Sequence, residues 1–371
     1  PIGHEIACDQ FRLPIESPKK AFKTSGPKLT VSTNGDNLSA SSSKVNFVFN
    51  RKTGIVTSYK VDGTEYFSEG FGIQPNFWRA PTDNDYGNGM PKRLQVWKES
   101  SKNFNVTDAT VTMDGNNAVV NVNYLLPAGN LYIVNYTIYP SGAVNVAARF
   151  TSTDMDAAQT EVSEATRTAT FTPGRDAARK EASKLNVPRI GVRFRLPASM
   201  NQVEYFGRGP AENYLDRNAG SMIGLYKSTA EELYFPYVRP QENGHHTDTR
   251  WVSLSTGKKG LLIQADNTIG FNALRNSIED FDDEEATGLP RQWSNFTPEQ
   301  VANHDEAAAK SVLRRQHHIN DITPRDFVEV CVDLKQQGVA GYDSWGSRPE
   351  PAYTLPANRE YNWGFTLIPL K

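Results

Sequence analysis

The sequence predicts an all-β fold, one large two-sheet sandwich, and three observations point to it. Of the 371 residues, 11% are aromatic, with 18 Phe, 15 Tyr and 6 Trp, and such side chains favour strands. The 27 Gly and 22 Pro supply frequent turns. Between these turns, apolar and polar residues alternate with a period of two, which turns one face of each strand toward a core. Helical periodicity is rare.

The first strand is expected at residues 1–14, where the alternation begins with the chain. A lone strand cannot bury its own face, so we expect a fragment whose first strand belongs to an upstream domain. Residues 16–40 are rich in Ser, Lys and Pro and are interpreted as a linker leading into the next strand. The division that follows is a strand of another domain at 1–18, a linker at 19–27 and one main domain at 28–371.

Further strands follow in close succession. Val45, Phe47 and Phe49 alternate with polar residues, and a turn at 50–54 leads into a strand at 55–61. Asp-Gly pairs at 62–63 and 114–115 are strong hairpin signals. The remaining expected strands are 106–113, 118–126, 131–139, 144–150, 190–196, 250–255, 261–265, 327–334 and 361–368, with Pro140-Ser141-Gly142 as the turn between two of them.

Two segments depart from this pattern. Residues 154–185 are charged and Ala-rich, with Pro173-Gly174 inside, and are interpreted as a mobile excursion with some helical tendency. Residues 298–315 are expected to be a helix, because the segment starts with Pro, has an Ala-rich middle and ends on basic residues.

Charge and cysteine content exclude several classes of protein. Lys and Arg number 40 against 42 Asp and Glu, so no basic surplus exists to neutralise nucleic acid, and no nucleic-acid partner is expected. No run of about 18 apolar residues occurs, so no membrane span is expected. The two cysteines, Cys8 and Cys331, exclude a disulfide-rich scaffold and a four-Cys zinc site, and both are expected to remain thiols.

Three groups of residues superficially suggest metal binding. The acidic run at 280–285 is interpreted as a solvated loop. The segment 83–87 departs from the calcium-loop pattern, because Gly87 occupies an acidic position and no glutamate follows at the required distance. Neighbours on a strand point to opposite faces, so the His pairs at 245–246 and 317–318 are expected to be structural or solvent-facing. No metal is therefore expected in this chain.

Three Gly- and Pro-rich segments, expected to be loops, mix aromatic side chains, amides and carboxylates. They are NFWRAPTDND (76–85), FGRGPAENY (206–214) and YDSWG (342–346). An aromatic ring can stack on the apolar C–H face of a pyranose, while amides and carboxylates hold its hydroxyls. Taken singly, such residues are best explained as ordinary residues at the edge of a core. Taken together, the three segments are explained equally well by a sugar site and by the edge of a core. Glycoside hydrolysis needs a pair of carboxylates, and the sequence alone picks out no such pair.

Four stretches together resemble a known family. They are NFWRAPTDNDYGNG (76–89), YFGRGPAENYLDR (205–217), YVRPQENGHHTDTRW (237–251) and GVAGYDSWG (338–346). From about residue 28 to 370 the chain is similar to the small-chain domain of the large β-galactosidases of glycoside hydrolase family 2. The opening GHEIACDQFRLP resembles the last strand of the immunoglobulin-like domain that precedes it in that family.

The resemblance implies a large β-supersandwich of the galactose-mutarotase type. It also implies that the two catalytic glutamates and the magnesium ligands belong to an upstream (β/α)₈ barrel, so that this chain holds no catalytic residue and no cofactor. The activity implied for the whole enzyme is hydrolysis of terminal non-reducing β-D-galactose residues with retention. The implied partners are the galactoside, the barrel, the immunoglobulin-like domain and, in the full-length protein, further copies in a homo-oligomer.

The resemblance further implies that this domain supplies one wall of the sugar pocket. Trp345 of the D-S-W motif would stack on the sugar, and Asp343 would fix the loop or accept a hydroxyl hydrogen bond. Asp83 and Asn84 of the T-D-N-D motif are included as substrate-binding residues, and the loop that starts near Gly87 can close over the site.

This sequence departs from the family pattern at two places, and two other functions stay open. The excursion around residues 175–185 is longer than expected for the family. The family usually has Gly-Gly-Asp before the D-S-W core, whereas here Ala340, Gly341 and Tyr342 stand there. The same sandwich carries aldose 1-epimerases, which use a His acid and a Glu base; Glu242 with His245 or His246 would take these roles. The third interpretation is a non-catalytic carbohydrate-binding or architectural module.

Overall fold

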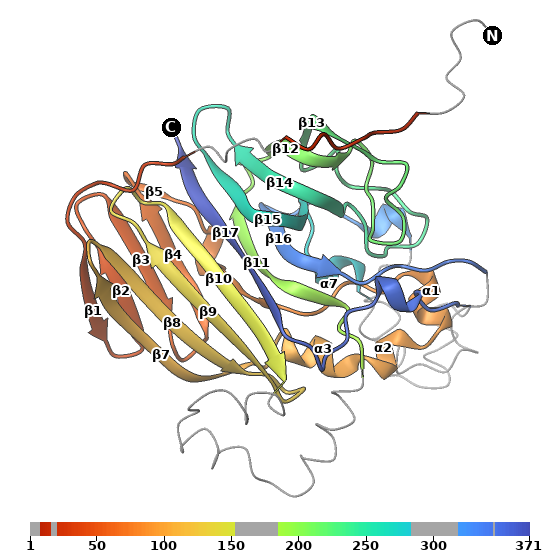
Figure 1. The fold of residues 1–371 in the computed structure, drawn as a ribbon, viewed down its shortest axis with the longest axis horizontal. Coiled ribbons are helices and arrows are strands. Elements are labelled where there is room, and N and C mark those ends of the chain that lie inside the picture. Colours follow the sequence, from red (N-terminus) through yellow and green to blue (C-terminus); the bar gives the residue numbers. More distant parts are fainter. Residues whose placement is uncertain (1–7, 16–20, 153–184, 283–317, 344–345) are drawn as a thin grey trace, which may run out of the picture.

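The computed structural model describes residues 8–15, 21–152, 185–282, 318–343 and 346–371 (Figure 1). Within them the all-β prediction is confirmed, because the chain forms a five-stranded sheet, a 12-stranded sheet and only short helices. Of the expected excursion at 154–185, only residue 185 is described. The expected helix at 298–315 lies wholly outside the described residues. No helix of the described part is long and apolar enough to cross a membrane.

The smaller sheet is an antiparallel meander in the order β1-β2-β3-β4-β5. Its β3–β4 turn and the Asp62-Gly63 turn are as expected, the latter with positive φ at both residues. Two of its strands fall mainly within residues 16–40, so the linker interpretation is wrong there. The Ser-, Lys- and Pro-rich composition suggested a linker, but Leu38 and Ala40 are buried. The strands are β1 (Thr30–Asn34), β2 (Asn37–Ser41), β3 (Val45–Asn50), β4 (Ile55–Val61) and β5 (Thr64–Glu65).

The larger sheet has the order β13-β12-β14-β15-β17-β10-β9-β8-β7, while β16 joins β15 to β11, and β11 pairs with β6. Its strands are β6 (Gln74–Asn76), β7 (Asn105–Asp114), β8 (Asn117–Leu125), β9 (Asn130–Ile138), β10 (Val144–Ser152), β11 (Arg189–Pro197), β12 (Gln202–Gly209), β13 (Met222–Thr229), β14 (His246–Ser255), β15 (Gly260–Leu274), β16 (Phe327–Gln336) and β17 (Tyr361–Leu370).

Every strand expected from the alternation between residues 106 and 368 is present. Two further strands in this range, β12 and β13, were not predicted. β12 contains the first part of the FGRGPAENY segment, which was expected to be a loop; that interpretation is wrong for Phe206–Gly209 because alternate residues of β12 are buried. The β7–β8 hairpin is confirmed, with Gly115-Asn116 as its two-residue loop.

Three short helices follow β6 in a row along one end of the sheets (Figure 1). The T-D-N-D motif, expected to be a loop, forms the start of the first one, because Thr82 and Asp85 make a capping box. The third buries Trp97. The helices are α1 (Asp83–Gly87), α2 (Met90–Arg93), α3 (Gln95–Ser100) and, farther along the chain, α7 (Ile278–Phe281).

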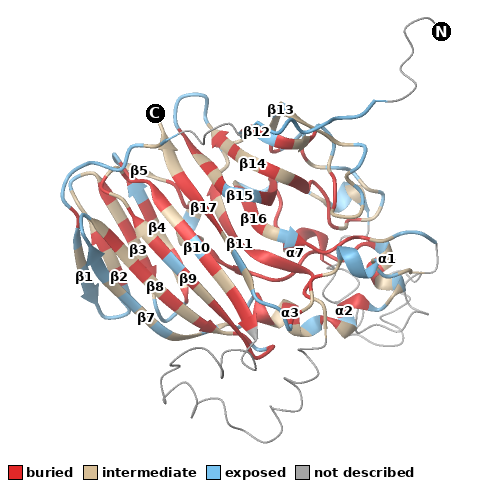
Figure 2. Ribbon diagram, in the orientation of Figure 1, coloured by how far each residue is buried: buried red, intermediate tan, exposed pale blue. Residues whose placement is uncertain are grey.

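A large part of the core lies between the smaller sheet and the β7–β10 part of the larger one. Phe47 of β3 packs on Tyr136 of β9 with ring centroids 5.6 Å apart. The hydroxyl of Tyr124 donates to the carbonyl of Gly54 across the same interface, at 2.9 Å. Figure 2 shows buried residues along the central strands and exposed ones on β1 and β7. Residues far apart in sequence thus form one continuous core.

Residues 8–15 form no strand, so the expected strand at 1–14 is wrong for its described part. The side chain of Gln10 instead exchanges two hydrogen bonds of 2.7 Å with the backbone of Ile223 in edge strand β13. Cys8 of this segment is exposed and Cys331 of β16 is buried, and both carry thiols as expected. The domain boundaries at residues 18 and 27 stay a prediction.

Candidate functional site

The four motif stretches contact one another in the structure, although they are far apart in the sequence. Helix α1, from the 76–89 stretch, lies beside the segment that follows β16 (Figure 1). The 205–217 stretch reaches the same segment through Asp216, and the 237–251 stretch reaches α1 through its residues near 240. The segment after β16 is called the 338–347 loop, of which residues 338–343 and 346–347 are described.

Arg79 joins α1 to the 338–347 loop. Its Nη1 lies 2.8 Å from a carboxylate oxygen of Asp85, and its Nη2 donates to the carbonyl of Gly338 at 3.3 Å. Arg79 and Asp85 are both buried. Burial raises the pKa of the Asp85 carboxyl, while Arg79 and Thr82 act in the opposite direction. The ion pair therefore fixes the start of α1 relative to the loop.

The far end of the loop rests on the end of α1. A Cβ placed on Gly346 would lie only 2.4 Å from the carbonyl carbon of Gly87, and Gly346 has φ +85°. The side-chain amide of Asn88 donates to the carbonyl of Ser347 at 3.4 Å. Only glycine permits this backbone conformation and this close approach together.

Asp216 holds the first part of the loop. One carboxylate oxygen accepts the backbone N–H of Val339 at 3.0 Å, and the other accepts that of Ala340 at 2.8 Å. Asp216 follows β12 in the ENYLDR sequence, more than 120 positions before its partners. The first three residues of the loop are thus held by Arg79 and Asp216 together.

The 237–251 stretch covers the first turn of α1. The backbone N–H of Asp83 donates to the side-chain oxygen of Gln241 at 3.2 Å, and the Asp83 carboxylate lies 3.4 Å from Arg239. The guanidinium of Arg239 stacks over the ring of Tyr86, 4.2 Å from its centroid. The Asp83 side chain remains 60% exposed, so its carboxylate is accessible from outside.

The structure brings together four of the five residues predicted to contact the substrate. Asp83 and Asp343 are exposed, and the backbone N–H of Asp343 donates to the Ser347 hydroxyl at 3.2 Å. Asn84 is half-buried beside Gly341, and Gly87 contacts the end of the same loop. Trp345 lies outside the described residues. Substrate contact by any of the five, Asp83, Asn84, Gly87, Asp343 and Trp345, stays a prediction.

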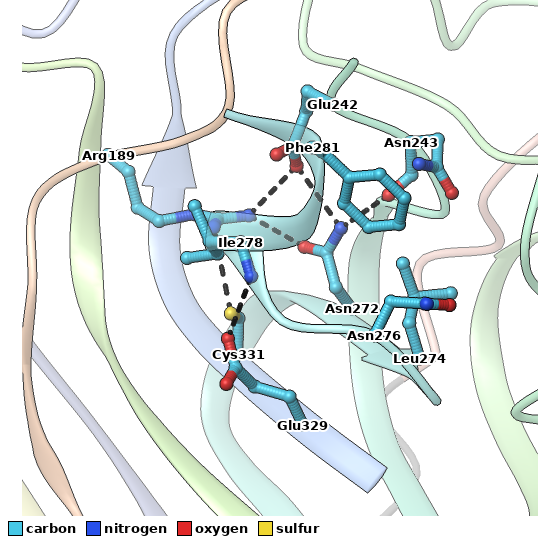
Figure 3. A pocket seen from close by; sticks show the side chains of 10 residues that line it. All are labelled: Arg189, Glu242, Asn243, Asn272, Leu274, Asn276, Ile278, Phe281, Glu329 and Cys331. Atoms are coloured by element: carbon cyan, nitrogen blue, oxygen red, sulfur yellow. Dashed lines mark hydrogen bonds and ion pairs between the residues drawn. The ribbon is translucent and has the colours of Figure 1, made fainter. Parts of the chain in front are cut away.

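A second candidate centre is a buried polar cluster around Arg189 (Figure 3). One guanidinium nitrogen donates to Glu242 at 3.1 Å and to Asn272 at 2.6 Å, and another lies 3.1 Å from Asp333. Glu242 also accepts from Gln336 at 2.9 Å. Burial and the Glu242 charge raise the pKa of Asp333 to about 7, although Arg189 opposes the shift.

The cavity beside this cluster is too small for a sugar. Its volume is about 20 Å³, which is room for roughly one water molecule. Its lining residues, all drawn in Figure 3, are Arg189, Glu242, Asn243, Asn272, Leu274, Asn276, Ile278, Phe281, Glu329 and Cys331. The polar side chains here bind one another and leave no space for a ring substrate.

The two neighbouring histidines are buried and have different surroundings. His245 stacks on Tyr214 and its Nδ1 lies 2.9 Å from the side-chain oxygen of Asn272. His246 stacks on Phe271. Burial lowers the pKa of His245 and brings that of His246 to about 4, so both rings are neutral at pH 7. They have the structural role expected from the sequence.

The acidic run at 280–285 is not a solvated loop where it is described. Asp280 caps α7 with Ser277 and pairs with Arg325 at 3.1 Å. Asp282 accepts the indole N–H of Trp78 at 2.7 Å and lies 2.8 Å from Lys98. Both carboxylates are buried. The interpretation from sequence is therefore wrong for these two residues, and residues 283–285 lie outside the described part.

Comparison with known proteins decides the family. A family model described as "Beta galactosidase small chain" matches residues 41–367. The chain belongs to the β-galactosidase small-chain family. The resemblance that the four motifs indicated is thereby confirmed.

Relatives of this small-chain domain differ in how much more protein they contain. A β-galactosidase from Priestia megaterium is 31% identical over 99% of this chain, and one from Streptococcus thermophilus is 26% identical over all of it. The chain spans about 30% of the length of these relatives. A "Beta-galactosidase small subunit" from Latilactobacillus sakei is 27% identical over 86% of this chain and 92% of its own length.

Two solved structures from Lactobacillus acidophilus show a weak similarity to the small-chain domain. One is a galactose 1-epimerase, with a TM-score of 0.43 and 8% identity over 93% of this chain and 98% of its own. The other is a galactose mutarotase related enzyme, with a TM-score of 0.42 and 10% identity over 90% and 97% of the two chains. Nothing about activity follows from a likeness of this degree.

Three residues that organise the loops of the small-chain domain were not singled out from the sequence. Arg79, Asp85 and Asp216 all lie inside the motif stretches, but none of them is among the residues predicted to bind substrate. For Asp216 the sequence offers only a general signal, because Asp side chains in loops commonly accept backbone N–H groups. For Arg79 the signal is weaker, since burial of its partner is not visible in sequence.

The small-chain domain also has an open groove of about 370 Å³ beside Asp216. Much of its polar lining binds other parts of the protein; Arg217, for example, donates to Glu212 at 2.7 Å. The groove is lined by Glu212, Leu215, Asp216, Arg217, Asn218, Ala219, Gly220, Ser221 and Tyr353.

Proposed function

We propose that this chain is the non-catalytic part of a β-galactosidase that hydrolyses terminal non-reducing β-D-galactose residues with retention. In this proposal it supplies one wall of the sugar pocket. The observation that carries the proposal is the convergence of α1 and the 338–347 loop, which Arg79 and Asp216 hold together. This convergence brings the elements that carry Asp83, Asn84 and the exposed Asp343 into contact.

Within this wall each side chain has a distinct proposed role. The indole of Trp345 offers an apolar platform to the C–H face of galactose. Asp343 and Asp83 accept hydrogen bonds from sugar hydroxyls, and Asn84 can donate and accept. The segment after Gly87 covers the bound sugar. None of these groups carries out a bond-breaking step, so their contribution is to bind and orient.

The catalytic carboxylates are proposed to lie on the barrel domain of the whole enzyme. A retaining glycosidase needs two carboxyl groups roughly 5–5.5 Å apart on either side of the glycosidic bond. Glu242 and Asp333 are buried around Arg189, beside a cavity of about 20 Å³, and cannot reach a sugar. Among the described residues no group of three His, Cys, Asp or Glu side chains is placed to hold a metal ion. The family resemblance implies a magnesium site on the barrel, and we propose it there as well.

The proposed partners follow from the same division of labour. The sugar-facing wall needs a second domain to complete the pocket, so the barrel and the immunoglobulin-like domain are its expected neighbours, in a homo-oligomeric enzyme. The relatives support either arrangement, a longer polypeptide or a separate small subunit.

The experiment is a complementation assay with a chromogenic β-galactoside. The purified chain alone should show no turnover, because positioning of reactive carboxylates supplies much of the rate. The same chain joined to, or mixed with, the barrel segment of its enzyme should restore hydrolysis. Robust hydrolysis by the chain alone, abolished by Glu242→Gln, would refute the assignment of catalysis to the barrel.

Two further measurements on the chain alone separate the alternatives. An aldose 1-epimerase would accelerate the mutarotation of α-D-galactose in a polarimeter. We expect no acceleration, because the cavity beside Glu242, of about 20 Å³, is too small for a sugar. A stand-alone binding module would bind galactosides saturably without turnover and would gain no activity from the barrel segment.

A further inference from the structure

The 338–347 loop begins with a backbone that needs outside support. Ala340 has φ +57°, a left-handed conformation that is sterically unfavourable for alanine. Such strained residues persist only where the surroundings hold them. Gly341, the next residue, also has positive φ. The turn that leads to Asp343 is therefore not one that the chain adopts by itself.

Asp216 supplies that support at the strained residue itself. Its carboxylate accepts the N–H of Ala340 at 2.8 Å and that of Val339 at 3.0 Å. Hydrogen bonds from backbone N–H to a charged carboxylate are about twice as strong as those between neutral groups. Two of them on adjacent residues fix both the position and the orientation of the turn.

The Asp216 carboxylate lies so close to Gly338 that no larger residue fits at that position unless the carboxylate moves. A Cβ on Gly338 would lie 2.3 Å from an oxygen of Asp216, closer than any real contact. Both backbone polar groups of Gly338 are hydrogen-bonded. Its N–H donates to the carbonyl of Tyr353 at 2.8 Å, and its carbonyl accepts from Arg79. Carboxylate and loop thus fit together over three consecutive residues.

We propose that Asp216 is a positioning residue for galactoside binding. It fixes the backbone of Val339 and Ala340, and through this backbone it fixes the place of Asp343, three residues further on, at the sugar-facing wall. The inference rests on the proposed function, in which Asp343 contacts the substrate. Asp216 itself is half-buried, and both of its carboxylate oxygens accept backbone N–H groups of the loop.

The expected consequence is a defect in binding rather than in chemistry. Without Asp216 the loop samples other conformations, and apparent affinity falls by the fraction of time spent in the competent one. A competent fraction of about one tenth raises KM about tenfold. Since the reacting carboxylates are on another domain, kcat should stay within about twofold, the pattern of lost uniform binding.

The test uses the complete enzyme with barrel and small-chain domain. Asp216→Asn keeps the side-chain shape but sets an NH₂ group against one of the two N–H donors. Gly338→Ala keeps the carboxylate and pushes it aside, so it provides an independent second variant if Asp216→Asn folds poorly. Asp280→Asn is the matched control, because Asp280 also accepts a backbone N–H, that of Ser277 at 2.8 Å, on an element away from the loop.

Both loop variants should raise KM for a chromogenic galactoside about tenfold with kcat nearly unchanged. The control should lower the melting temperature and leave KM unchanged. If the control raises KM as much as Asp216→Asn does, the role is merely structural and the inference is overturned.

Asp343→Ala, measured beside these variants, separates two kinds of failure. If Asp343→Ala raises KM while Asp216→Asn and Gly338→Ala do not, the positioning inference is wrong and the proposed function stands. If Asp343→Ala and Trp345→Ala both leave KM unchanged, the proposed sugar-facing wall is wrong, and the inference falls with it.

Discussion

The guanidinium of Arg79 and the carboxylate of Asp85 form an ion pair of 2.8 Å from which solvent is excluded. Arg79 follows β6 and Asp85 lies in α1, so the pair closes the connection between strand and helix. The same guanidinium reaches Gly338, 259 positions later in the chain. One buried charge pair thus connects the small helices to the loop that the proposed function places at the sugar.

Removing one partner of this pair should be costly. In Arg79→Ala the Asp85 carboxylate stays buried without its cation, and such changes lose about 3–5 kcal/mol of unfolding free energy. Urea denaturation of the isolated chain measures the loss. Lys227→Ala, which removes a largely exposed partner of Glu204, serves as the control and should change stability by no more than about 0.5 kcal/mol. Equal effects of the two variants would contradict the prediction.

The Arg189 cluster should give the chain a measurable dependence of stability on pH. Burial raises the pKa of Asp333 to about 7, so between about pH 4 and 7 the folded state binds a proton that the unfolded state lacks. This contribution lowers stability as pH rises through that window. The lowered pKa values of His245 and His246 act oppositely, because the unfolded chain binds their protons below about pH 6.5.

Asp333→Asn separates the two contributions. The variant lacks the carboxyl and keeps the histidines, so its stability should rise more steeply between pH 4 and 7 than that of the wild-type chain. Urea denaturation at several pH values in this range gives the slopes. A wild-type slope equal to that of the variant would show that Asp333 titrates normally.

Ala340→Gly should stabilise the chain. Glycine adopts φ +57° without the steric cost that alanine has there, and relief of such strain is worth roughly 0.5–1 kcal/mol after the entropy of glycine is counted. Ala147→Gly in strand β10 is the matched control and should destabilise by roughly 0.5–1 kcal/mol, because that position is extended. Thermal unfolding of both variants compares the signs, and destabilisation by Ala340→Gly would contradict the prediction.

Trp345→Ala distinguishes a sugar platform from a core residue. A platform should lose little stability and weaken galactoside recognition by about 1–3 kcal/mol, the range for ring stacking on bases. A core tryptophan should lose about 3–5 kcal/mol of stability instead. The paired measurements are the melting temperature of the chain and KM of the whole enzyme. A collapsed melting temperature with unchanged KM rejects the platform.

Much of the fold could be predicted from the sequence, because a strand with one buried face shows its alternation directly. The strands missed were those where other signals competed. In β12 the residues Gly207 and Gly209 suggested a loop, although a glycine is needed at position 207 beside Thr249 of the neighbouring strand. β1 and β2 were not predicted because the Ser-, Lys- and Pro-rich composition of residues 16–40 suggested a linker over the whole segment.

The candidate site could be predicted as a group of loops but not as a set of contacts. The motif stretches gave Asp83, Asn84, Gly87 and Asp343, which the structure brings together. The residues that hold them have partners far along the chain, as with Asp216 and Ala340, 124 positions apart. The burial of Asp282 was missed for the same reason, since its partner Trp78 lies 204 positions away. A sequence shows which side chains carry a charge, but it does not show which distant residue binds them.

The position of β17 has a consequence for how the protein is made. This strand lies between β10 and β15, with Val144 opposite Leu367 and Leu261 opposite Pro369. It leaves the ribosome about 200 residues after β10, which at roughly 5–20 residues per second is a delay on the order of 10–40 seconds. For that time the nascent chain carries an open strand edge, which favours wrong pairing with other chains. Chaperones that shield β-edges during synthesis should therefore raise the yield of this protein more than later stabilisation of its folded form.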